Sequence, residues 1–250
     1  MCFADDHAMT ASPEEGLQPM MEALERTSEE YGMRINLKKT KVMMFTKGQP
    51  RKLSIWLRNT ELEFCYLGSL LIEDARCDKE IKKRIAVAKA AFMSRGELLR
   101  GNISRDLKKR MVKSLVWSVA LYGSETWTPR KEDIKRIQAF EMWIWRKMEK
   151  ISWTAHVSNE EVLSLVKEQR CLVHVIKQRQ ANWIGHDLRH DCLLKTVPEG
   201  KMEGKRTRGK PRRKMLDSLT QQEDKKINYQ ELKRRAEDRI QWHHHQLNLP

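Results

Sequence analysis

The spacing of apolar residues along this 250-residue chain changes after residue 73. Before that point, short apolar runs alternate with polar loops, which is typical of strands combined with one amphipathic helix. From Asp78 onward, apolar residues recur at steps of three and four, which predicts a succession of helices. We therefore expect an α+β fold, in which a small layer of hairpin, helix, strand and hairpin precedes a mostly helical region.

One helix is predicted in the first part, over Thr10–Tyr31. Ser12 and Pro13 supply an N-cap and a first-turn proline, and Gly32 ends the helix. Its apolar stripe is most simply a core face, made of Leu17, Met20, Met21, Leu24 and Tyr31.

Strands are predicted on the far side of a lysine-rich loop. Residues 42–45 form an apolar run that predicts a buried strand, and residues 53–57 and 61–66 predict a hairpin. Gly68 permits a sharp turn after it.

The second part predicts helices separated by short breaks. Gly101 breaks the first of them, and Ser104 can cap the next. Further helices are expected over about 131–151, after a cap at Ser158, through 173–184, and over about 229–245. In the third helix, Trp143 and Trp145 flank Ile144, which makes the apolar arc too wide for one partner. Either two neighbours cover this arc, which is the simpler interpretation, or one tryptophan is exposed and could stack on a base.

The net charge of +15 is unevenly distributed. Residues 1–75 carry nine Lys/Arg and twelve Asp/Glu residues, whereas residues 76–250 carry 40 and 22, a net of +18. A basic body of this size favours a polyanion, most simply nucleic acid. The alternative is a soluble basic surface without a specific partner.

A basic linker is predicted over 198–214, where proline and glycine recur. Its segment Arg208–Arg212 is similar to a minor-groove hook, although Lys210 replaces the usual arginine. A nuclear-import signal is an equal alternative to the hook. A solvated linker that adds nonspecific phosphate affinity is the favoured interpretation. Its candidate nucleic-acid-binding residues are Lys205, Arg206, Arg208, Lys210, Arg212, Arg213 and Lys214.

The chain has five cysteines, an odd number, and they are widely spaced. This pattern is typical of reduced thiols, so it indicates an intracellular protein. Cys171 and His174 precede His186 and His190 in a spacing compatible with zinc. Cys171 and His174 lie in an apolar segment that predicts helix, and the stretch between the two pairs predicts helix too, so zinc is the less favoured interpretation. No run of about 18 uncharged apolar residues and no export signal are seen.

Adjacent carboxylates, Asp5 and Asp6, follow an aromatic residue at the start of the chain. A tight turn between short strands would bring both acids near one site, where hard oxygen ligands favour Mg²⁺ or Mn²⁺. Two such ions can activate a hydroxyl and stabilise a leaving phosphate oxygen. An ordinary solvated acidic turn is the alternative.

Several segments, in order, resemble reverse transcriptases of RTE-like non-LTR retrotransposons. Phe3-Ala4-Asp5-Asp6 resembles the [F/Y]-A-D-D box, Gly32–Asn36 with Lys39-Thr40 resembles the loop after the palm helix, and Tyr66-Leu67-Gly68 resembles the primer-grip turn. Similar segments follow downstream: Leu121–Trp127, Trp143–Met148, Ile151–Thr154, Asn159–Leu163 and Gly185-His186. The resemblance extends from residue 2 to about 215.

This resemblance implies RNA-directed DNA polymerisation, with an RNA template, a DNA primer or target, and a nuclear location. It implies Asp5 and Asp6 as ligands of Mg²⁺ (or Mn²⁺) and Lys39 near the departing pyrophosphate. It also implies that Tyr66, Leu67 and Gly68 hold the primer. The resulting divisions are 1–73 as the end of the palm, 74–128 as the thumb, 129–197 as a helical region, 198–214 as the linker, and 215–250 as basic terminal helices. The basic thumb, with Lys82, Lys83 and Arg84, would follow the duplex backbone.

Departures from the family pattern limit the expected activity. The third aspartate, the fingers and the usual endonuclease domain would precede Met1, and His7 stands where an apolar strand residue is preferred. We therefore expect a fragment that cannot polymerise alone. A nucleic-acid-binding module and a decayed relic without a maintained function are the alternatives.

Overall fold

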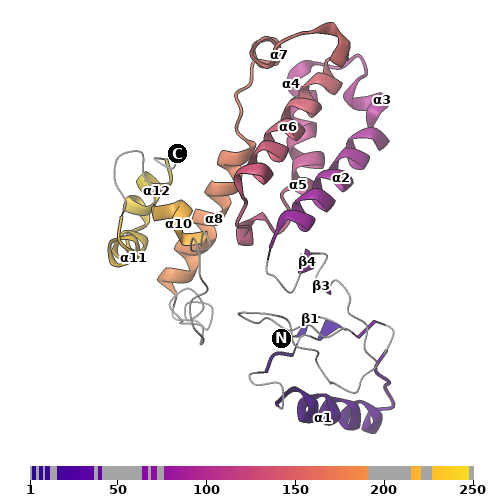
Figure 1. Cartoon of the computed structure of the whole chain (residues 1–250), viewed down its shortest axis with the longest axis vertical. Helices are drawn as coiled ribbons and strands as arrows, with labels where there is room; N and C mark the ends of the chain where they lie inside the picture. The colour runs from indigo at the N-terminus through magenta and orange to yellow at the C-terminus, as the bar shows by residue number, and fades with distance from the viewer. Residues whose placement is uncertain are drawn as a thin grey trace. The chain divides into compact units, whose positions relative to one another are not determined.

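The computed structural model divides the chain into two compact units, with the division after residue 75. It describes residues 2–3, 6–7, 9–11, 16–36, 39–40, 64–66, 69–71, 76–190, 215–220 and 227–247. Figure 1 shows helices and strands of both units. The assignment of these units to palm and thumb stays a prediction.

The strands of the first unit form two short antiparallel pairs. β1 (Cys2–Phe3) pairs with β2 (Asp6–His7), and Phe3 lies opposite Asp6. β3 (Phe64–Tyr66) pairs with β4 (Ser69–Leu71), and Cys65 lies opposite Leu70. In the described residues each sheet has two strands, of two or three residues each.

The predicted α+β class is therefore not supported, because the described part of the chain is mostly helical. Independent sheet stability needs at least three strands with a hydrophobic face, and these pairs are too small to supply one. The strand predicted over 42–45 and the hairpin strand predicted over 53–57 lie outside the described residues.

Helix α1 (Leu17–Glu30) accounts for most of the helix predicted in this unit. Gly32 ends it as expected, since its φ is +69° and its N–H donates to the Glu29 carbonyl. The expected core stripe is only partly correct, because Met21 is buried whereas Met20 and Tyr31 are exposed. Tyr31 follows the last helical residue, so the helical spacing no longer places it on the inner face. The predicted cap at Ser12 and Pro13 lies outside the described residues.

The second unit is built from helices, several of which lie side by side in Figure 1. The first group is α2 (Asp78–Ser94), α3 (Gly96–Leu99), α4 (Arg105–Met111), the π-helical η2 (Val112–Trp117), α5 (Ser118–Ala120) and the 3₁₀ turn η3 (Ser124–Thr126). The second group is α6 (Lys131–Met148), η4 (Trp153–Ala155), α7 (Asn159–Val166) and α8 (Leu172–Arg189). The last group is α10 (Met215–Thr220), α11 (Tyr229–Glu237) and α12 (Arg239–Leu247).

Local capping signals correctly located two of these helices. The Ser104 hydroxyl accepts a hydrogen bond from the Leu107 N–H at the start of α4. At the start of α7, Ser158 and Glu161 form a reciprocal capping box with bonds of 3.2 and 2.8 Å. These bonds satisfy helix N–H groups that have no partner within the helix.

The single terminal helix predicted over about 229–245 is two helices instead. Asp238 adopts an extended backbone conformation, and its carboxylate accepts hydrogen bonds from the Ile240 and Gln241 N–H groups. It therefore caps α12 and ends the helix before it, because an aspartate side chain competes with the backbone for helix N–H groups.

Two hydrophobic clusters fill the second unit, and α8 contributes to both. The first cluster draws on α2 through α8 and includes Phe92, Trp145 and Ile176. The second cluster contains Ala181, Ile184, Leu188, Leu219, Leu232, Ala236 and Trp242. Because α8 is continuous, it connects the helices of the first cluster to α10, α11 and α12 (Figure 1).

Candidate nucleic-acid interface

The residues predicted to hold metal are only partly described. Asp6 is the first residue of β2, and Asp5 lies outside the described residues. Lys39 is exposed in a turn in which its N–H and that of Thr40 both donate to the Asn36 carbonyl at 2.9 Å. The metal role of Asp5 and Asp6 and the pyrophosphate role of Lys39 stay predictions.

The predicted primer-grip segment begins at the end of β3. Tyr66 is the last residue of that strand and lies opposite Ser69. Leu67 and Gly68 lie outside the described residues, so their role stays a prediction. The predicted basic linker, with its seven candidate cations, lies outside them as well.

The three predicted cations of α2 differ in environment. Lys82 and Lys83 are exposed on the helix, and Lys82 lies 3.9 Å from Asp78. Arg84 is turned inward, where it pairs with the buried Glu80 at 2.6 Å and lies 4.4 Å above the centre of the Tyr122 ring. Arg84 therefore has a structural role, because it compensates a buried carboxylate, and its nucleic-acid-binding role stays a prediction.

The cysteine and histidine residues of the possible zinc site are spread along α8. Cys171 is its N-cap, and His190 is its C-cap. The 12 positions from His174 to His186 on a continuous helix correspond to about 18 Å, so the two pairs do not meet. Among the described residues, no group of three or more His, Cys, Asp or Glu side chains could hold a metal ion.

Burial also makes Cys171 a poor metal ligand or nucleophile. Burial and the neighbouring Glu141 raise the pKa of the Cys171 thiol to about 11, so the unreactive neutral thiol prevails near neutral pH. Glu141 is itself fully buried and accepts hydrogen bonds from the N–H groups of Cys171 and Leu172. Burial raises its pKa, and the two backbone donors oppose that shift.

Both tryptophans of α6 contact neighbouring aromatic residues. This agrees with the expectation that two neighbours cover the wide apolar arc of this helix. Trp145 is fully buried and packs edge-on against Trp117, with ring centres 6.0 Å apart. Trp143 is half-buried between Phe92 and Phe140, and the Lys89 ammonium lies 5.2 Å from its ring centre. Burial was the favoured interpretation, and it is confirmed for Trp145.

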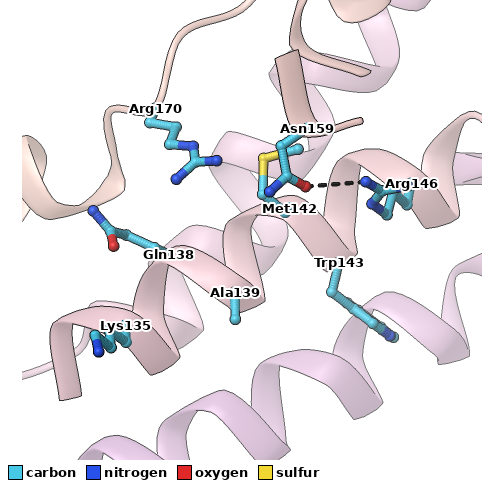
Figure 2. A pocket seen from close by; sticks show the side chains of 8 residues that line it. All are labelled: Lys135, Gln138, Ala139, Met142, Trp143, Arg146, Asn159 and Arg170. Atoms are coloured by element: carbon cyan, nitrogen blue, oxygen red, sulfur yellow. Dashed lines mark hydrogen bonds between the residues drawn. The ribbon is translucent and has the colours of Figure 1, made fainter. Parts of the chain in front are cut away.

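A hollow of about 430 Å³ lies along α6, and we call it the α6 hollow. Eight residues line it: Lys135, Gln138, Ala139, Met142, Trp143, Arg146, Asn159 and Arg170. Figure 2 shows Arg170 and Asn159 on one side of α6 and Trp143 on the other. Sequence reasoning missed this hollow, since its lining comes from α6, the start of α7 and the segment before α8. The sequence signal that could have indicated the hollow was a cation, Arg146, three positions after Trp143.

The described part of the chain is thus a helical protein with exposed cations on α2 and a cationic hollow on α6. Among the described residues, no helix is long and apolar enough to cross a membrane. The sequence is 26% identical over 193 residues to an uncharacterized transposon-derived protein of Caenorhabditis elegans. That similarity covers 74% of this chain and 69% of the relative, and it points to a transposon origin. The sequence matches no described protein family and no solved structure.

Proposed function

We propose that this chain is the C-terminal part of an RTE-like non-LTR retrotransposon reverse transcriptase. The ordered set of motifs from residue 2 to about 215 carries this proposal, and the similarity to a transposon-derived protein supports it. In this proposal residues 1–73 supply the end of the palm, including its hairpin with Asp5 and Asp6. The basic helical unit that follows binds template and primer.

The chemistry proposed for the full polymerase is nucleotidyl transfer, in which divalent cations supply the activation of the 3′-hydroxyl. Asp5 and Asp6 would hold these ions, Lys39 would lie near the departing pyrophosphate, and Tyr66, Leu67 and Gly68 would position the primer. Of these residues, Asp6 is described by its backbone as the first residue of β2, and Asp5, Leu67 and Gly68 lie outside the described residues.

Primer extension tests the polymerase part of the proposal. The purified chain, given a primed RNA template, deoxynucleotides and Mg²⁺, should incorporate no nucleotide, because the third carboxylate of the family pattern lies outside this sequence. Joining it to the upstream palm and fingers of a related element should restore incorporation, and Asp5→Ala should abolish it again. Incorporation by this chain alone that Asp5→Ala abolishes would overturn the requirement for upstream residues. A joined protein that stays inactive would count against the ancestry.

Nucleic-acid binding is the function that the geometry of the second unit supports best. Lys82 and Lys83 are adjacent exposed cations on α2, and residues 76–250 carry a net charge of +18. Each phosphate neutralised on a duplex contributes about 0.9 to the slope of log affinity against log salt. Replacing both lysines by alanine should therefore reduce that slope by about 1.8 if both contact phosphates.

A matched control removes two exposed cations elsewhere. Lys108 is half-buried and unsuitable, whereas Lys167 and Arg110 are exposed on other elements. The variant Arg110→Ala/Lys167→Ala removes the same charge, so it isolates the effect of position from that of net charge. A wild-type affinity that does not fall as salt rises would argue against phosphate-driven binding.

A further inference from the structure

We propose that the α6 hollow binds one unpaired nucleotide of a single-stranded nucleic acid. This inference rests on the nucleic-acid binding proposed above and does not require polymerase activity. Its volume of about 430 Å³ lies in the range of sites that hold a single small ligand. The bases of a duplex are paired and stacked, so only an unpaired nucleotide can place its base in such a hollow.

Three cations give the hollow its preference for a phosphate. Lys135, Arg146 and Arg170 line it, and the lining residues include no acid. Lys135 is exposed and has no ion pair or hydrogen bond among the described residues. Arg170 forms a long ion pair with Glu160, 3.8 Å apart on an exposed surface, and such pairs contribute little. Its charge also acts on the buried Glu141 carboxylate, whose pKa it lowers. Both cations are therefore available to a phosphate group.

Arg146 is fixed in place, which makes the hollow a preformed site. Its Nη2 donates to the Val157 carbonyl at 2.8 Å. The same nitrogen donates to the Asn159 side-chain oxygen at 3.0 Å (Figure 2). Both bonds use one nitrogen, so the rest of the planar guanidinium can donate to a ligand. Since the side chain is already ordered, a ligand does not have to offset the entropy of ordering it.

The remaining lining residues suit a base. Ala139 is a small exposed residue between the cations of α6, and Met142 and Trp143 add apolar surface. The Trp143 ring is held by its aromatic neighbours, so it forms a rigid wall instead of a mobile stacking platform. Gln138 and Asn159 bring amide groups that can bond base edges.

A filled-hollow variant tests this site without changing the charge. Ala139→Leu places a larger side chain among the lining residues and keeps good helix propensity, whereas Ala139→Ser at the same position stays small. Fluorescence anisotropy would measure binding of labelled single-stranded RNA, single-stranded DNA and duplex DNA of about 12 nucleotides. We expect Ala139→Leu to weaken binding of both single strands about tenfold, and Ala139→Ser and duplex binding to change less than twofold.

A charge variant tests the phosphate contacts independently. Lys135→Ala/Arg170→Ala should reduce the salt slope for the single strands by about 1.4, because each phosphate contact contributes about 0.7. The control Lys131→Ala/Lys147→Ala removes two exposed cations of α6 that do not line the hollow, and it should leave that slope nearly unchanged. Thermal unfolding of all variants would confirm that they are folded.

The outcomes separate the site from the proposed function. If the wild-type protein bound neither single strands nor duplex, both the proposed nucleic-acid binding and this site would be refuted. Normal wild-type binding with unchanged Ala139→Leu affinity would refute the site alone. Equal weakening of duplex and single-strand binding would also refute it, since the hollow would then be part of a general cationic surface.

Discussion

Gly185 lets the terminal helices dock on α8, so we expect Gly185→Ala to release them. A Cβ at this position would lie 2.1 Å from Nε1, 2.6 Å from Cε2 and 2.8 Å from Cδ1 of Trp242. These distances are far below van der Waals contact, and Trp242 is only 3% exposed, so the indole must leave its place. It would also lose the 3.1 Å hydrogen bond that it donates to the Ala181 carbonyl.

The expected cost follows from the lost contacts. Removing a buried tryptophan lowers the free energy of unfolding by about 3–5 kcal/mol. The lost hydrogen bond accounts for about 1 kcal/mol of this loss. Alanine offsets about 1 kcal/mol, because it favours the helix more than glycine does. Gly185→Ala should therefore lower the free energy of unfolding of the second cluster by about 2–4 kcal/mol.

Hydrogen exchange detects this change locally, since protection should fall in α11 and α12 and stay high in α6. Gly96→Ala is the matched control, because its added Cβ would meet only the movable end of the Arg100 guanidinium. In a Trp242→Ala background the clash is absent, so Gly185→Ala should there be neutral or stabilising. Undiminished protection of α12 in Gly185→Ala, or equal effects in both backgrounds, would refute this reasoning.

Two further predictions concern the buried carboxylates of the second unit, Glu141 and Glu80. Burial raises the pKa of Glu141 in the folded protein above its value in the unfolded chain. The contribution of Glu141 to the free energy of unfolding is therefore greatest below the unfolded-state pKa, and it is lost as pH rises through the folded-state pKa. Glu141→Gln should gain melting temperature relative to wild type as pH rises from about 5 to about 8, and a pH-independent difference would contradict this. Arg84→Ala should cost about 3 kcal/mol in urea unfolding, because it removes the cation that lies 2.6 Å from the buried Glu80 carboxylate. Lys82→Ala should change stability by less than about 0.5 kcal/mol, and equal losses in the two variants would show that Arg84 is not structural.

Local signals in the sequence located several helix boundaries. Ser104, Ser158 and Gly32 act on backbone groups within a few residues, so their effects could be predicted without knowledge of the rest of the chain. Asp238 acts in the same way, and an N-cap at this residue was available as a signal for the break between α11 and α12.

The tertiary structure decided which side chains are available for function. Arg84 looked like its neighbours Lys82 and Lys83, yet it pairs with Glu80 four residues earlier on the same helix, and the packing of α2 buries Glu80 and places Arg84 over the Tyr122 ring. The metal role predicted for Asp5 and Asp6 and the primer role predicted for Tyr66, Leu67 and Gly68 still rest on the sequence resemblance.

The sequence by itself determined the helical character of the region after Asp78, its basic charge and the caps of individual helices, because these depend on residue type and short spacing. Only the tertiary structure brought Arg146 and Arg170, 24 positions apart, to one hollow. It likewise seated Trp242 on Gly185. Contacts between distant segments depend on how whole helices pack, and helical spacing constrains only the face that each helix buries.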